Sequence, residues 1–147
     1  MELKLEIAVI PVSDVDRAKG FYEQAGFRLD ADFSTDKGLR VVQATPPGSE
    51  ASIIFGEKLT SALPGSSYGL HLITRDLAAA RDELREKGID VSPIWHDADG
   101  IFHYEGDYNR VPGPHPASDS YGSYASFSDP DGNTWTIQQI VTRAPGR

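Results

Sequence analysis

The sequence predicts an α+β fold in which two similar halves follow one another within a single domain, residues 1–147. Three observations support this prediction: an internal repeat, an apolar helical stripe after a short strand in each half, and a hairpin marked by Pro and Gly near the end of each half. A chain of 147 residues also has the usual size of one domain.

The internal repeat is defined by matched aspartates and glycines. Asp14 and Gly26 correspond to Asp76 and Gly88, each of which lies 62 residues further along the chain. Because both pairs keep the same offset, the two segments are expected to have the same structure.

Each repeated segment predicts a helix after a short strand. The apolar stretches 5–12 and 70–74 precede Asp14 and Asp76, whose carboxylates can cap a helix N-terminus. Gly26 and Gly88 can end the helices, because glycine readily adopts the left-handed conformation. Apolar residues recur at helical spacing in both segments: Val15, Ala18 and Tyr22 in the first, and Leu77, Ala80 and Leu84 in the second.

A hairpin is predicted near the end of each half. Residues 44–48 and 128–132 are turn-forming, and each is followed by a strand-like run. The offset here is 84, so the second half carries about 22 extra residues, which we assign to a long loop over 92–122. We therefore divide the chain into a first module at 1–58, a linker at 59–68 and a second module at 69–142.

Composition excludes several classes of protein. The chain has no cysteine, so it can form neither disulfides nor thiolate metal sites. Its net charge of −8 argues against nucleic acid as a partner. The charge is typical of a solvated surface that keeps a protein in solution, and it also suits a cationic ligand. No apolar run approaches the length of a membrane span, and the N-terminal residues alternate charged with apolar, so we expect no membrane partner and a cytoplasmic location.

Two sets of residues resemble the vicinal oxygen chelate superfamily, which includes glyoxalase I, extradiol dioxygenases, fosfomycin-resistance enzymes and bleomycin-binding proteins. The first set runs from Val12-Ser13-Asp14 through Ala18 and Phe21-Tyr22 to Gly26-Phe27, and the second is the run from Phe127 to Asn133. The resemblance covers about residues 5–141. It implies two βαβββ modules in tandem forming a curved mixed sheet around a cavity (the glyoxalase/bleomycin resistance/dioxygenase fold), and a homodimer.

The same resemblance implies a divalent metal held by His, Glu or Gln at four strand positions. Counting from the helix-capping aspartates and the turn glycines places these positions at Ile7, Ser52, Gly69 and Thr136. Ile and Gly have no donor side chain, and Ser and Thr are weak neutral ligands. We therefore expect no metal cofactor, although a displaced divalent metal site that uses His71 and Gln138 stays open.

The expected cavity wall follows from strand alternation. His71 and Gln138 lie two residues beyond Gly69 and Thr136 and so point to the same face, whereas Trp135 is expected to pack beneath a helix. Aromatic residues and three histidines are concentrated in the predicted loop, which suits a lid or a dimer contact. The predicted cavity residues are Ile7, Val9, Ser52, Gly69, His71, Trp95, Phe102, His103, Thr136 and Gln138.

Three functions remain open at this point. The first is a metal-free protein that binds a small, partly aromatic or cationic organic molecule, similar to the bleomycin-resistance branch of the family. The second is a glyoxalase-type lyase, isomerase or dioxygenase that uses a displaced metal, or uses His71 and a loop histidine as acid and base. The third is a structural module that binds a protein partner and has no defined cavity.

Overall fold

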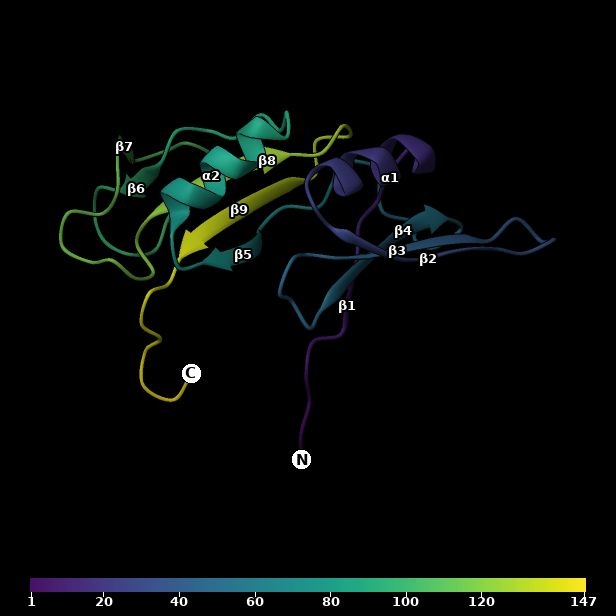
Figure 1. Cartoon of the computed structure of the whole chain (residues 1–147), viewed down its shortest axis with the longest axis horizontal. Helices are drawn as coiled ribbons and strands as arrows, with labels where there is room; N and C mark the ends of the chain where they lie inside the picture. The colour runs from purple at the N-terminus through teal and green to yellow at the C-terminus, as the bar shows by residue number, and fades with distance from the viewer. The chain divides into compact units, whose positions relative to one another are not determined.

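The computed structural model describes residues 1–147 as an α+β structure with two sheets and two helices. The chain divides into two compact units (Figure 1). Unit 1 contains residues 1–68 together with the turn 128–134, and unit 2 contains residues 69–127 and 135–147. At ten residues each, the two helices are too short to cross a bilayer.

Unit 1 has the predicted βαβββ order. Its four-stranded sheet has the order β1-β4-β3-β2, with β1 parallel to β4 and the other pairs antiparallel. The elements are β1 (Ile7–Val9), α1 (Val15–Gln24), β2 (Arg28–Ser34), β3 (Arg40–Thr45) and β4 (Ser52–Glu57).

Helix α1 begins and ends as the sequence predicts. The Asp14 carboxylate accepts a hydrogen bond from the Arg17 backbone N–H, and Gly26 takes a φ of +96° just beyond the helix. The predicted stripe of Val15, Ala18 and Tyr22 is buried. It packs on the sheet face that carries Val42, Ile53 and Phe55, which are also buried.

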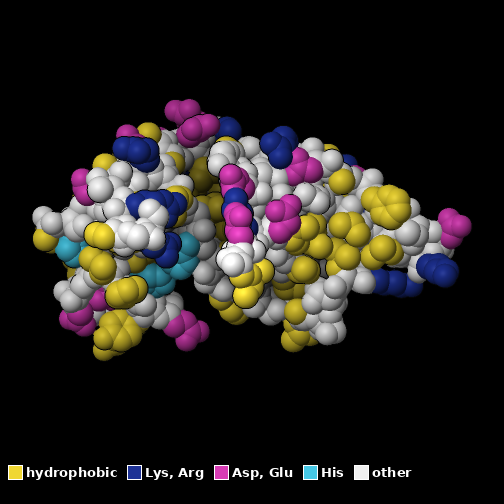
Figure 2. Space-filling view, turned by 90° about the horizontal axis from the view of Figure 1, so that it is seen from below, with side chains coloured by type: hydrophobic (Ala, Val, Ile, Leu, Met, Phe, Trp, Pro, Cys, Tyr) yellow, Lys and Arg dark blue, Asp and Glu magenta, His cyan; other side chains and the backbone are white.

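The opposite face of this sheet is apolar and uncovered within unit 1. Ile7, Val9 and Phe33 are 38%, 41% and 58% exposed. Figure 1 draws α1 above the sheet, and Figure 2, seen from below, shows apolar side chains gathered on the side without the helix.

Unit 2 repeats this plan with one more strand. Its sheet has the order β5-β9-β8-β6-β7, with β5 parallel to β9. The elements are β5 (Leu70–Thr74), α2 (Leu77–Glu86), β6 (Trp95–Asp97), β7 (Arg110–Pro112), β8 (Tyr124–Ser128) and β9 (Thr134–Gln139). Asp76 caps α2 through the Ala79 N–H, and Gly88 follows the helix with a φ of +86°, as predicted.

The prediction of a loop throughout 92–122 was wrong in part. Residues 95–97 and 110–112 form the antiparallel pair β6–β7, and β6 also pairs with β8 through Trp95 and Tyr124. Dense Gly, Pro and Asp suggested a loop, but these two short runs satisfy their backbone groups by joining the edge of the sheet. The loop that remains between them is residues 98–109.

The turn 128–134 is held in unit 1 by buried polar groups. The Tyr22 hydroxyl donates to Asp129 Oδ2 over 2.9 Å, and Asn133 Nδ2 donates to the same oxygen and to the Pro11 carbonyl, each over 2.8 Å. Asp129 and Asn133 are both almost fully buried. Because a buried carboxylate without donors would be costly, these hydrogen bonds specify how the turn lies against α1.

Gly65 leaves room for the same turn. It has a φ of +82°, and a Cβ on it would lie only 2.1 Å from the Asp131 carbonyl oxygen. Gly48 has a similar φ of +75°, but a Cβ there would meet nothing within 4 Å. The two glycines therefore share the backbone constraint and differ in steric contact.

We expect Gly65→Ala to destabilise the protein by about 1–3 kcal/mol more than Gly48→Ala, because only the first forces the turn to move. Both substitutions carry the cost of a positive φ, which cancels in the comparison. Urea denaturation followed by circular dichroism measures the difference. An equal decrease in the free energy of unfolding in the two variants would show that close contact with the turn does not constrain Gly65.

Candidate ligand-binding site

The uncovered face of the unit 2 sheet carries the predicted histidine. Trp135 is buried, and the Leu77 N–H at the start of α2 donates to Gln139 Oε1, so Trp135 and Gln139 lie on the helix side as predicted for Trp135. His71 pairs with Thr136 and Ile73 with Gln138 across β5 and β9. Alternation therefore places His71, Thr136 and Gln138 together on the face away from α2.

The predicted position of Gly69 on this face was wrong. In unit 1, Ile7 pairs with Ser52, and the equivalent pair in unit 2 is His71 with Thr136. Gly69 precedes β5 and has a φ of +84°. The connection from strand to capping aspartate is two residues shorter in unit 2, so a constant offset of 62 fits the helices but not the strands.

Trp95 lies at the centre of an aromatic cluster on this face. Its ring stacks on Tyr124 of β8 at 4.8 Å between centroids, and the Arg110 guanidinium of β7 lies 3.7 Å from its centroid. These neighbours come from the strands on either side of β6. Trp95 is consequently only 5% exposed, and it supports the surface instead of offering a free ring face to a ligand.

His103 brings the loop 98–109 onto this cluster. Its ring centroid lies 5.3 Å from that of Trp95 and 4.7 Å from that of Tyr124, both edge-on. It also stacks on His71, with the two Nε2 atoms 3.2 Å apart. Two of the predicted cavity residues, 32 positions apart in the sequence, therefore meet directly.

The two histidines present their lone pairs to each other. His71 Nδ1 lies 2.8 Å from the Gly69 carbonyl, and His103 Nδ1 lies 3.0 Å from the Tyr104 carbonyl. A carbonyl only accepts, so each Nδ1 must carry the hydrogen and donate. Both Nε2 atoms are then acceptors in the neutral rings, and a hydrogen bond between them needs an added proton. A donor group of a ligand would satisfy the same two atoms.

The side chains of Tyr124 and Gln138 form hydrogen bonds with backbone carbonyls around the cluster. The Tyr124 hydroxyl lies within hydrogen-bonding distance of the Ile101 and Tyr121 carbonyls, and Gln138 Nε2 donates to Tyr121 and more weakly to Tyr124. Burial raises the pKa of the Tyr124 phenol, so it stays a donor at neutral pH. These contacts hold Ile101 close to the sheet and thereby position His103.

Four other predicted cavity residues lie outside the cluster around Trp95. Phe102 is 84% exposed and borders a hollow of about 280 Å³ formed by residues 99–104 and Asp97. Ser52 is buried, and its Oγ lies 2.7 Å from Thr45 Oγ1. Ile7 and Val9 lie on the uncovered face of the unit 1 sheet.

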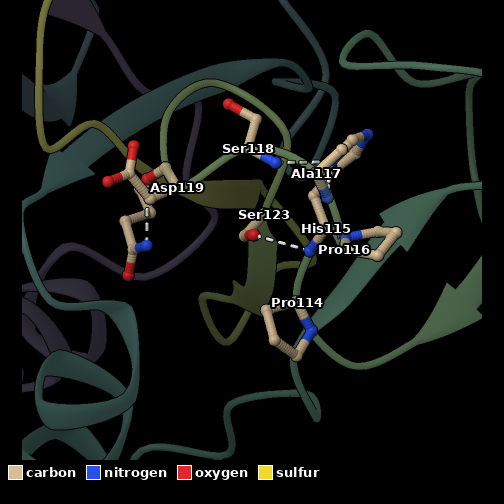
Figure 3. Close-up of a pocket in the computed structure, with 8 residues that line it drawn as sticks. Pro114, His115, Pro116, Ala117, Ser118, Asp119 and Ser123 are labelled. Carbon is tan, nitrogen blue, oxygen red and sulfur yellow. Dashed lines mark hydrogen bonds between the residues drawn. The ribbon is translucent and has the colours of Figure 1, made fainter.

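A larger polar hollow of about 620 Å³ lies elsewhere in unit 2, and the sequence did not point to it (Figure 3). His115 Nδ1 accepts from the Ala117 and Ser118 N–H groups over 3.1 Å, and the His115 N–H donates to Ser123 Oγ. The polar atoms around this hollow thus bind one another. Its lining residues are Pro114, His115, Pro116, Ala117, Ser118, Asp119, Ser123 and Gln139.

The side chains at the four metal positions do not fit a divalent metal. With the corrected register these positions are Ile7, Ser52, His71 and Thr136, and only His71 supplies a nitrogen donor. No group of three or more His, Asp or Glu side chains in the structure is arranged to hold a metal ion. His71 and Gln138 lack a third strong ligand.

The comparisons with known proteins agree with this fold. The family model described as "Glyoxalase/Bleomycin resistance protein/Dioxygenase superfamily" matches residues 4–137. The chain belongs to this superfamily. A search of curated proteins found no match.

Solved structures of the superfamily resemble the chain over nearly its full length. An antibiotic binding protein, TnmS3 from Streptomyces sp. CB03234, is 31% identical with a TM-score of 0.68, covering 95% of this chain and 97% of its own. A glyoxalase/bleomycin resistance protein from the same organism is 32% identical with a TM-score of 0.66, covering 92% and 100%. A superfamily member from Sphaerobacter thermophilus DSM 20745 is 28% identical with a TM-score of 0.66, covering 94% and 98%.

We expect Tyr124→Phe to loosen the loop 98–109, because the Ile101 and Tyr121 carbonyls lose their shared donor, at a cost of about 1–3 kcal/mol. Hydrogen exchange of the amides in this loop should become faster while exchange in unit 1 stays unchanged. Tyr104→Phe is the control, since the Tyr104 hydroxyl is exposed and only weakly bonded to Asp99. The same exchange rates in both variants would refute this role of Tyr124.

Proposed function

We propose that this protein binds a small, partly aromatic organic molecule on the face of the unit 2 sheet away from α2, without transforming it. The observation that carries the proposal is the His71–His103 pair seated on Trp95 and Tyr124. Aromatic and imidazole rings provide a stiff surface for a planar ligand, and the two Nε2 atoms provide acceptors for one of its donor groups.

Binding without turnover is supported by the chemistry of the side chains present. The family's metal positions hold Ile7, Ser52, His71 and Thr136, which cannot together provide a Lewis acid site. We therefore propose a metal-free protein. The 31% identity to an antibiotic binding protein supports a small-molecule ligand of the antibiotic type.

One observation favours an enzyme as the second candidate. The facing Nε2 atoms of His71 and His103 are placed to accept a proton from a bound molecule, as general bases do. A glyoxalase-type isomerase or lyase that uses this pair would lose turnover when His71 is replaced. A binding protein would only lose affinity.

A binding screen with a panel of planar aromatic antibiotics tests the proposal. We expect His103→Ala to weaken binding of any hit about 3- to 10-fold, because it removes one ring of the surface and one acceptor. His96→Ala is the control, since His96 contacts the Gly113 carbonyl and His115 instead of the cluster. Calorimetry measures affinity, and mass spectrometry of the recovered ligand detects turnover. If His103→Ala leaves the affinity for every hit unchanged, the ligand does not bind at this face. If a product forms and its formation requires His71, the protein is an enzyme.

We also propose that the protein is a homodimer. The uncovered sheet face of unit 1 exposes Ile7, Val9 and Phe33, an apolar surface that a second copy can bury.

Sedimentation equilibrium should therefore give twice the chain mass of 16.0 kDa. Phe33→Glu should shift the protein toward monomer, because it places a charge in the contact. Leu63→Glu serves as the control, since Leu63 is exposed in the linker outside this face. A monomeric wild-type protein would refute the dimer.

A further inference from the structure

Arg110 combines three properties: it forms no ion pair, it packs on an aromatic ring, and part of its guanidinium is buried. Arg17, Arg28 and Arg40 each form an ion pair with aspartate. The Arg110 guanidinium instead lies over the Trp95 ring, and its Nε is buried without a hydrogen-bond partner. The site thus contains a cation that the protein itself leaves unpaired.

The nearest carboxylates do not satisfy this cation. Asp97 is opposite Arg110 in the strand register, but its Oδ1 accepts from Asn109 Nδ2 and from the Asp99 N–H. Asp107 acts on Arg110 only through space. Burial lowers the pKa of Arg110, because removing water disfavours the charged form, although a guanidinium stays charged at neutral pH.

Arg110 lies on the same face as the histidine pair. Trp95 and Tyr124 are directly opposed across β6 and β8, Asp97 and Arg110 across β6 and β7, and residues 95 and 97 share a side of β6. Tyr124 in turn contacts Gln138 and His103. Both Arg110 and His103 contact the Trp95 ring, so the three side chains lie next to one another on this face.

An anionic group on the ligand would supply the ionic partner that the Arg110 guanidinium lacks within the protein. Hydrogen bonds from a guanidinium to an oxyanion are roughly twice as strong as neutral ones, and partial burial strengthens them further. The net charge of −8 repels anions at long range, so the anion must be attached to a group that gains from apolar contact. An aromatic acid combines the two requirements.

We infer that the ligand is an aromatic acid, whose carboxylate, sulfonate or phenolate is bound by Arg110 while its ring system packs against His71 and His103. This inference rests on the proposed function, and it replaces the cationic ligand that net charge alone suggested. Arg110 is then the residue that selects acids over neutral molecules of the same shape.

A matched pair of fluorescent probes tests this inference on the intact protein. 1-Anilinonaphthalene-8-sulfonate and N-phenyl-1-naphthylamine share one ring system, and only the first carries an acidic group. We expect Arg110→Gln to weaken binding of the sulfonate about 10-fold or more, as expected for loss of a charged hydrogen bond, and to change binding of the neutral amine less than 2-fold. Arg110→Lys, which keeps the charge, should retain more sulfonate binding than Arg110→Gln.

Two controls separate this inference from the proposed function. Arg143→Gln removes the same charge from an exposed position of unit 2 and should leave both probes unaffected. His103→Ala should weaken both probes, which places them at the proposed site. If neither probe binds the wild-type protein, or His103→Ala changes neither, the proposed site is wrong. If both probes bind at the proposed site but Arg110→Gln changes their affinities equally, the proposed site is kept and the acidic ligand is refuted.

Discussion

Each sheet in this protein has one helix, which can cover only one of its two faces. Strand alternation then assigns every side chain either to the packed side or to the uncovered side. In unit 2 this rule places Trp135 beneath α2 and leaves His71 and Gln138 on the free face. The candidate site, its histidine pair and its aromatic support all depend on that division.

The sequence predicted correctly where the helices begin and end, because these features depend on residues close together in the chain. Asp14 and Asp76 cap their helices, and Gly26 and Gly88 end them, because these properties depend on a few neighbouring residues. The strand register is different, because a loop can shorten by two residues without changing the helix that follows. That shortening moved the equivalent of Ile7 from Gly69 to His71.

The candidate site could be predicted only in part from the sequence, because some of its contacts join residues far apart in the chain. Alternation identified His71 and Gln138, since both lie on regular strands. The contact between His71 and His103 depends on how a loop folds back, and the position of Arg110 depends on β7, a strand that the many Gly and Pro residues made look like a loop. Arg110 lies two residues before a Pro-Gly-Pro run, and nothing in the sequence around it indicated a strand; its place on the sheet is set by the pairing of β7 with β6.

The strand positions at which the family resemblance implied a metal carry side chains that are poor ligands for one. In unit 1 these positions hold Ile7 and Ser52, and in unit 2 they hold Thr136 and His71, whose Nδ1 lies against a backbone carbonyl. Arg110, on the same face of the unit 2 sheet as His71, adds a positive charge that is held against Trp95 and partly shielded from water. Under the proposed function, the guanidinium and the two imidazole acceptors orient a ligand through hydrogen bonds and do not activate it as a Lewis acid, which is the balance that a binding protein requires.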